Sequence, residues 1–325
     1  MARGRTVRLL GNTVGLTVGV LVGTSLLAVP MAWLTTRTAL PGRKLLTLLG
    51  VLPLAVPGYV MAYALLATTG PYGTLAQTLG LVVPRLSGYT GAVLALSLST
   101  FPYLFLNLRT AFLGLDPALE ESAQALGHNR WQVFVRIVLP QLRPALLAGG
   151  LLIALHVLGD FGVVSLMRYD TFSYALYIQY AASYDRIYAA GLALLLLMLT
   201  AAILVLEARL LKGRLFHQTS SGTARSATLH RLGAWRWVGY AFALSVAGAS
   251  VVLPAGTVGY WMADSAATGL PWAGLGTALW DSVRASAPAA VLAALLSLPV
   301  AYLGVRHASS WTRGVERIAY LGYAT

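Results

Sequence analysis

The sequence predicts an all-α, polytopic membrane protein with seven spanning helices, a partial eighth and a parallel internal repeat. Of its 325 residues, 58% are hydrophobic and only 10% are charged, whereas soluble domains carry about 25% charged residues. Seven stretches are apolar over the roughly 20 residues that a spanning helix needs. One of these stretches also recurs near the end of the chain. Together the three observations exclude a soluble globular domain.

The seven apolar stretches follow one another with polar connections between them. Prolines inside them are compatible with spanning helices, because neighbouring helices can satisfy the freed backbone groups. An eighth stretch begins near Ile318 and is cut short at Thr325. The predicted spans are residues 12–34, 46–68, 88–112, 145–167, 188–207, 236–260 and 282–304.

Arginine and lysine orient these spans. The net charge is +13, and in a multi-spanning protein basic clusters mark cytoplasmic loops. No basic stretch carries the interleaved aromatic residues of a nucleic-acid groove, so no nucleic-acid partner is expected. The loops expected in the cytoplasm are 35–45, 113–144 and 208–236. The loops expected outside, poor in Lys and Arg, are 69–87, 168–187 and 261–281.

The internal repeat relates residues 12–37 to residues 281–306 without gaps. Both copies begin with polar residues, carry a proline seven residues before their end and finish on Arg37 or Arg306. Because the first and seventh spans run in the same direction, the repeat is parallel. The predicted organisation is a first repeat at 1–215, a cytoplasmic linker at 216–235 and an incomplete second repeat at 236–325.

The second copy has a helix in front of it, and the first has none. The topology also places the basic N-terminus, with Arg3, Arg5 and Arg8, outside, against the usual tendency. An additional leading helix would return it to the cytoplasm, so the chain is expected to lack one and to end early in its second half. A natural seven-helix protein is the alternative.

The loop 115–143 is too polar to span a membrane and has its own helix signals. Asp116 suits an N-cap and Pro117 the first helical position. Gly127 suits a left-handed turn at the helix end. Asn129 is expected to cap a second short helix, which Pro140 would stop. The sequence therefore predicts a helix–turn–helix on the cytoplasmic side.

The spacing in this loop resembles the EAA loop of binding-protein-dependent ABC importer permeases, the MetI-like type, whose pattern is E-A-A-x3-G-x9-I-x-L-P. The register selects Glu121 rather than Glu120, and Ser122 replaces one alanine. The resemblance implies a coupling helix that docks on a cytoplasmic ATP-binding subunit; a merely solvated amphipathic loop is the alternative. The implied interface residues are Glu121, Ser122, Ala123, Gly127, Ile137, Leu139 and Pro140.

Other stretches extend the resemblance. Residues 12–44 are similar to the first core helix of this family, and residues 159–177 are similar to ferric-iron permeases that fuse two halves in one chain. The resemblance implies an inner-membrane transport subunit, not itself an enzyme, with an external or periplasmic solute-binding protein and with ATP held by the partner subunit. No cofactor is expected in this chain, and a second coupling loop is expected beyond Thr325. Ferric iron is the substrate that this resemblance implies, and thiamine or another small solute stays open as the alternative.

Two other classes compete with an importer. A secondary transporter working by rocking of the two repeats would explain the repeat but not the loop spacing. A membrane-embedded enzyme would need a catalytic motif, and the chain shows none.

The expected translocation path includes His156 and Asp160, one turn apart in the fourth span. A charged residue inside a membrane normally faces a cavity or a partner; a hydrogen bond between helices is the alternative for Asp160. Arg168, Tyr169 and Asp170 are expected at the outer mouth, either on the solute-binding protein or as interface anchors. With no cysteine and five scattered histidines, no metal site is predicted.

Overall fold

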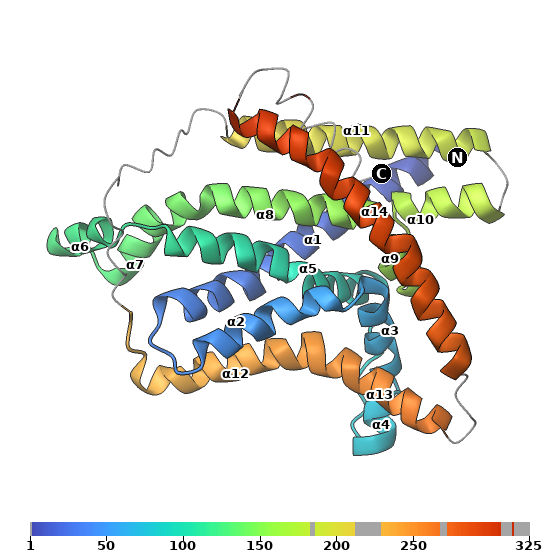
Figure 1. The fold of residues 1–325 in the computed structure, drawn as a ribbon, viewed down its shortest axis with the longest axis horizontal. Helices are drawn as coiled ribbons and strands as arrows, with labels where there is room; N and C mark the ends of the chain where they lie inside the picture. The colour runs from blue at the N-terminus through green and yellow to red at the C-terminus, as the bar shows by residue number, and fades with distance from the viewer. Residues whose placement is uncertain (1, 183–185, 212–228, 267–271, 307–313, 315–325) are drawn as a thin grey trace. The chain divides into compact units, whose positions relative to one another are not determined.

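The computed structural model describes residues 2–182, 186–211, 229–266, 272–306 and 314, and helices make up most of that part of the chain (Figure 1). No β-strand occurs among these residues, although an isolated parallel bridge joins Thr38 and His230. Contacts divide the chain into two units, Met1–Thr257 and Val258–Thr325. The predicted all-α class is therefore confirmed.

Within the described residues, six helical stretches are long and apolar enough to cross a membrane, and a bent helix pair adds a seventh. They match the seven predicted spans in order; the eighth, from Ile318, lies outside the described residues. The six are Gly4–Arg37, Gly88–Leu113, Trp131–Gly159, Arg186–Leu210, Gly233–Ala263 and Gly274–Pro299, and the bent pair is Arg43–Ala55 with Gly58–Thr68.

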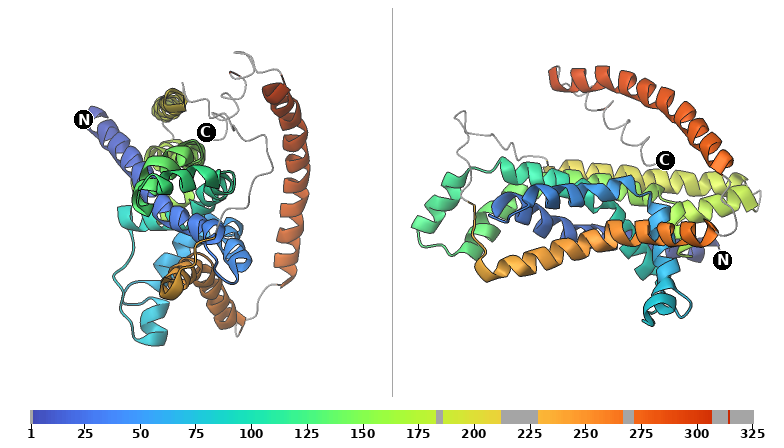
Figure 2. Two further views of the ribbon diagram at one scale, coloured as in Figure 1. Left: turned by 90° about the vertical axis from the view of Figure 1, so that its left-hand side faces the viewer. Right: turned by 60° about the horizontal axis from the view of Figure 1, so that its bottom comes forward.

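Three long helices form the centre of the first unit: α1 (Ala2–Arg37), α5 (Gly88–Leu113) and α8 (Leu139–Gly159). α5 packs against both of the others, and α11 (Arg186–Leu211) lies along α8 (Figure 2). Small residues permit the close approach of membrane helices. A Cβ atom added at Gly149 of α8, for example, would stand 2.8 Å from Cδ1 of Leu104 on α5.

The second predicted span, 46–68, is wrong as a single straight helix. Its place is taken by α2 (Arg43–Val51), the 3₁₀ turn η1 (Leu52–Ala55) and α3 (Gly58–Thr68), and the two arms meet at 96°. Val56 is extended, as expected for the residue before a proline. Pro57 then begins α3 as its N-cap, so the prolines break this span instead of being accommodated within it.

The fourth predicted span, 145–167, is also placed differently. The helix reaches back to Trp131 and ends at Gly159, and a separate short helix, α9 (Gly162–Leu166), follows. The connections expected outside the membrane contain further short helices: α4 (Thr74–Leu79), α10 (Phe172–Tyr177) and the π-helical η3 (Ile178–Ala182).

The start of the predicted second repeat packs on the first. After the short turn η4 (Gly233–Trp235), α12 (Arg236–Ala247), the π-helical η5 (Gly248–Val252) and α13 (Leu253–Ala266) follow. The Tyr240 hydroxyl donates a hydrogen bond to the Pro41 carbonyl over 2.8 Å. The first compact unit, Met1–Thr257, therefore extends past residue 236, where the second repeat was predicted to begin. The repeat boundaries at 215 and 236 describe sequence similarity, and they stay a prediction.

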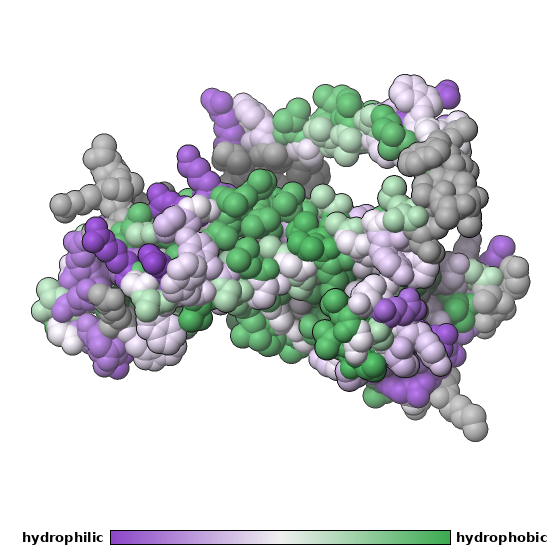
Figure 3. Space-filling view, turned by 90° about the horizontal axis from the view of Figure 1, so that it is seen from below, coloured by the Kyte–Doolittle hydropathy of each residue, from purple (hydrophilic) through white to green (hydrophobic). Residues whose placement is uncertain are grey.

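In the second unit, α14 (Trp272–Arg306) carries the second copy of the repeat. Each copy lies within its own continuous helix. Pro30 lies inside α1 and Arg37 in its last turn, and Pro299 and Arg306 have the same places in α14. Figure 3 shows apolar side chains over the middle of this face, whereas hydrophilic ones gather at the end occupied by the loop after α5 and again toward the opposite end. That distribution is expected for helices crossing a bilayer.

Candidate functional site

The predicted helix–turn–helix is present between α5 and α8. The Asp116 carboxylate accepts a hydrogen bond from the Ala118 N–H over 2.9 Å and caps α6 (Pro117–Ala125). Gly127 has φ +88°, and the following N–H, of His128, returns to the Ala123 carbonyl over 3.1 Å. These contacts satisfy helix-end groups as a left-handed terminal turn should.

The second helix, α7 (Arg130–Val133), begins with a reciprocal cap. Asn129 Oδ1 accepts from the Gln132 N–H over 2.8 Å, and Gln132 Oε1 accepts from the Asn129 N–H over 3.0 Å. This is the arrangement of a capping box. The predicted cap at Asn129 is therefore confirmed, together with a partner that the sequence analysis did not name.

The prediction that Pro140 stops the second helix is wrong. α7 continues through the π-helical η2 (Phe134–Val138) into α8. Pro140 has no N–H for the Arg136 carbonyl four residues back. Just before it the ladder is wider, because the Leu139 N–H bonds to the Phe134 carbonyl, five residues back. The loop is thus joined directly to a spanning helix through a π-turn.

The predicted interface residues occupy different environments. Glu121 and Ser122 are exposed on α6. Ala123, on the same helix, faces the rest of the loop and is 5% exposed. Gly127 is exposed in the turn. Ile137, Leu139 and Pro140 are half-buried, and α6 packs against η2, where Ile137 lies. The structure therefore brings α6 and the Ile-x-Leu-Pro stretch together.

The residue that connects the loop to the end of α1 was not predicted from the sequence. Glu120, one position before the selected glutamate, forms an ion pair with Arg37 at the end of α1, with 2.9 Å between Oε1 and Nη2. The side chains are only 17% and 6% exposed. Removing one partner of a buried pair costs about 3–5 kcal/mol, because the other charge stays uncompensated. The only sign of this contact in the sequence was that the same arginine ends both repeat copies, as Arg37 and Arg306.

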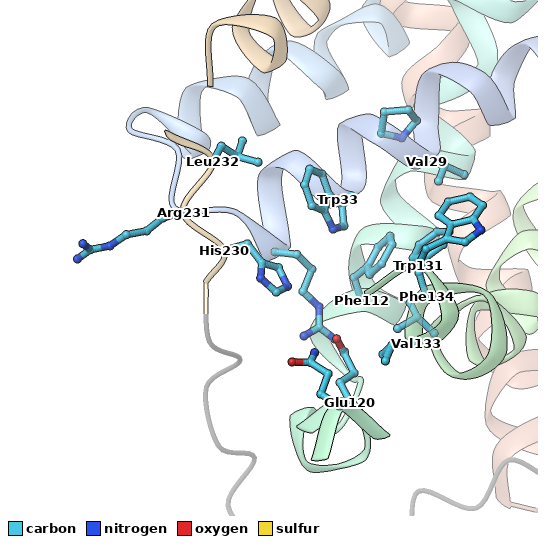
Figure 4. Close-up of a pocket in the computed structure, with 14 residues that line it drawn as sticks. Val29, Trp33, Phe112, Glu120, Trp131, Val133, Phe134, His230, Arg231 and Leu232 are labelled. Atoms are coloured by element: carbon cyan, nitrogen blue, oxygen red, sulfur yellow. The ribbon is translucent and has the colours of Figure 1, made fainter. Parts of the chain in front are cut away.

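A cavity of about 430 Å³ lies beside this ion pair. Figure 4 shows Glu120 extending from α6 toward the cavity, with Trp33 on one wall and Trp131 beside Phe134 on another. The last two rings stack with centroids 5.9 Å apart. His230, Arg231 and Leu232 complete the lining from the segment leading to α12, so α1, the loop and this segment meet here.

Asp160 lies at the break after α8 and not within a spanning helix. Its Oδ1 accepts hydrogen bonds from the Val163 and Val164 N–H groups over 2.9 and 3.4 Å. It therefore caps α9, where anionic groups are favoured. The His156 ring, one turn earlier, faces Tyr103 with centroids 6.2 Å apart. The partners of Asp160 are thus backbone groups of the next helix.

The three residues expected at the outer mouth lie in the turn between α9 and α10. Arg168 adopts φ +55°. The Tyr169 ring contacts Tyr89 of α5 with centroids 5.7 Å apart, and burial, with a smaller effect of Tyr89, raises the pKa of Tyr169 above its ordinary value. The Asp170 carbonyl accepts from Asn12 of α1 over 2.9 Å. The turn is therefore fixed against the starts of α1 and α5.

Metal ligands do not gather in the described part of the chain. Among those residues, no group of three or more His, Cys, Asp or Glu side chains lies close enough together to hold an ion.

Comparison with known proteins places this site in a family. The model of the family "Binding-protein-dependent transport system inner membrane component" matches residues 15–212. An inward-facing structure of the MetNI methionine ABC transporter matches with a TM-score of 0.51 and 17% sequence identity, over 63% of this chain and 94% of that chain. That similarity shows the fold alone.

Curated relatives carry different substrates in their names. The chain is 28% identical over 327 aligned residues to the Fe(3+)-transport system permease protein FbpB 2 of Haemophilus influenzae, covering 99% of this chain and 62% of that protein. It is 37% identical to the molybdenum permease ModB of Escherichia coli over 133 residues, which is 40% of this chain and 58% of ModB. The chain spans about three-fifths of the length of these relatives. It belongs to the family of binding-protein-dependent ABC importer permeases, multi-pass components of the inner membrane.

Proposed function

We propose that this chain is the permease subunit of an ATP-driven importer for ferric iron. The observation that carries the substrate is the similarity to the iron permease along 99% of the chain. The molybdenum permease ModB and a further relative, the sulfate transport system permease protein CysT of Escherichia coli, are similar over only about two-fifths of it. That shorter similarity reaches 37% identity, which makes a molybdenum or sulfate importer the alternative, beside thiamine or another small solute.

The loop between α5 and α8 is the proposed coupling loop, docking on a cytoplasmic ATP-binding subunit that holds the ATP. Glu121 and Ser122 form part of its exposed face. Leu126 and Trp131 are 82% and 71% exposed on the same loop. Exposed apolar groups on a polar surface suit a protein partner. Gly127 is exposed in the turn after α6, whereas Ala123, Ile137, Leu139 and Pro140 support the face from within the loop.

Asp160 and His156 are proposed to line the translocation path. The second Asp160 oxygen, Oδ2, points toward the start of α3, since a Cβ atom added at Gly58 would stand 3.9 Å from it. One oxygen thus holds α9, and the other lies at the break between α8 and α9. A carboxylate at this place offers a cation a weak oxygen ligand. Tight coordination would belong to the binding protein, because a permease must release its cargo.

Arg168, Tyr169 and Asp170 are proposed to contact the external solute-binding protein. Arg168 and Asp170 are exposed, and their turn is fixed by the Asn12 and Tyr89 contacts described above. A rigid turn with exposed charges suits a transient docking surface. Interface anchoring remains the alternative for these three residues.

Uptake in a deletion strain tests the substrate. Cells carrying the complete transporter are supplied with labelled ferric iron, and parallel cultures receive labelled molybdate, sulfate or thiamine. Accumulation of iron alone supports the proposal, whereas accumulation of one of the other solutes replaces iron as the substrate. Co-purification tests the importer class, because transport in the absence of any associated ATPase would indicate a secondary transporter.

A further inference from the structure

The Arg37–Glu120 ion pair has a specific place in the path from the loop to the membrane helices. It joins α6, the helix that carries the exposed face of the loop, to the end of α1. The main helix contacts of α6 are with α7 and η2 of its own loop. The ion pair therefore adds a direct link from α6 to the end of α1 beside these contacts.

The surroundings of the pair make each charge depend on the other. Neither Nη2 of Arg37 nor Oε1 of Glu120 has a hydrogen bond to another group, and both side chains are largely buried. A buried charge without its partner is strongly unfavourable. A cavity of about 430 Å³ lies beside the pair, lined by residues of α1, of α6 and of the rest of the loop.

The end of α1 is itself held in place. The His230 N–H donates to the Arg37 carbonyl over 2.9 Å, and the Ala39 N–H donates to the His230 carbonyl over 3.0 Å. Further along, α1 packs closely against α5 and α8. A displacement of the Arg37 guanidinium is therefore transmitted to a packed helix and is not absorbed by a loose terminus.

The two adjacent glutamates have different surroundings. Residues next to each other on a helix point about 100° apart, and here Glu121 is exposed while Glu120 faces inward. We propose that the Arg37–Glu120 ion pair is the positioning link that makes α6 and α1 move as one body when the ATPase closes. This inference rests on the proposed coupling function, and it gives Glu120 a role separate from that of Glu121.

The test measures whether α6 and α1 keep a fixed distance. Because the chain contains no cysteine, spin labels can be placed at Val7→Cys on α1 and Leu119→Cys on α6, two exposed positions. The distance distribution is recorded by pulsed electron paramagnetic resonance in the full transporter with its ATPase, before and after trapping with ATP and vanadate. With the pair intact, the distance is expected to stay the same.

The Arg37→Gln/Glu120→Gln double variant removes the link without leaving a buried charge, so it is expected to fold. In this variant, trapping should shift and broaden the distance distribution. The Arg37→Glu/Glu120→Arg exchange should bring back the narrow distribution, and Arg43→Gln, which removes an exposed arginine nearby, should leave it unchanged. Melting temperatures and ATPase co-purification confirm that each variant is folded and assembled.

The outcomes separate this inference from the function on which it rests. A narrow, unchanged distribution in the double variant overturns the link and leaves the importer intact. A distance that already shifts in the unmodified transporter overturns it as well. If no ATPase associates with the unmodified protein, the proposed function fails, and the inference fails with it.

Discussion

Gly23 of α1 and Ser97 of α5 lie in direct contact where the two helices cross. A Cβ atom added at Gly23 would stand 3.1 Å from Cβ of Ser97 and closer still to its Oγ. Gly19, one turn earlier on α1, similarly faces Tyr89 and Val93. Two glycines four residues apart are a common basis for close helix packing in membranes, and here they hold together the central helix pair.

Replacing Gly23 with valine is therefore expected to separate α1 from α5. Overpacking of this kind costs about 1–3 kcal/mol, and the melting temperature in detergent should fall accordingly. Gly11→Ala is the control for a glycine replaced on the same helix without overpacking, since nothing lies within 4 Å of a Cβ atom at that position. Gly11→Ala should be neutral or slightly stabilising, because alanine favours a helix by about 0.5–1 kcal/mol over glycine. An unchanged melting temperature for Gly23→Val would contradict the packing.

Changes at Asp160 separate its capping role from its proposed place in the path. Asparagine can also cap a helix, so Asp160→Asn should keep the melting temperature while lowering transport by removing the charge. Asp160→Ala should lower both, since losing a cap costs about 0.5–2 kcal/mol. Thermal melts and uptake rates of the two variants are compared at equal expression. Full transport by both variants would leave Asp160 with a structural role only.

The sequence predicted the fold more completely than the site, for physical reasons. Apolar length and loop charge act over whole segments, which is why seven spans were found. The bend at Pro57 and the break at Asp160 are single-residue events, and a hydropathy pattern averages over them. The caps at Asp116 and Asn129 were predictable because capping depends on neighbouring residues.

The Arg37–Glu120 contact joins residues 83 positions apart, and no local pattern encodes it. Loop spacing selects Glu121, but only the orientation of α6 decides which glutamate faces α1. The repeated arginine marked one end of the contact, while its partner needed the three-dimensional structure.

The capping box of α7 gives a local prediction. Asn129→Ala removes the acceptor of the Gln132 N–H, and Gln132→Ala removes the acceptor of the Asn129 N–H. Each should destabilise the start of α7 by about 1 kcal/mol, seen as roughly fivefold faster hydrogen exchange of amides in 129–133 in each variant. Gln124→Ala, exposed on α6, is the control. Unchanged protection in both box variants would show that the box adds no stability.

Leu126 provides the sharpest test of the docking face. Because its side chain is largely exposed, Leu126→Ser should leave the melting temperature of the isolated permease unchanged. If the loop inserts into a partner, the same change should weaken ATPase association by about 10-fold, which corresponds to the 1.4 kcal/mol of a moderate interface contact. Leu79→Ser on α4, also exposed, is the matched control and should bind the ATPase normally. Association is measured by titrating purified ATPase against the permease in nanodiscs. If Leu126→Ser binds the ATPase as tightly as the unmodified permease does, Leu126 is not part of the interface. A loss shared by both variants would instead point to a general effect of lowered surface hydrophobicity.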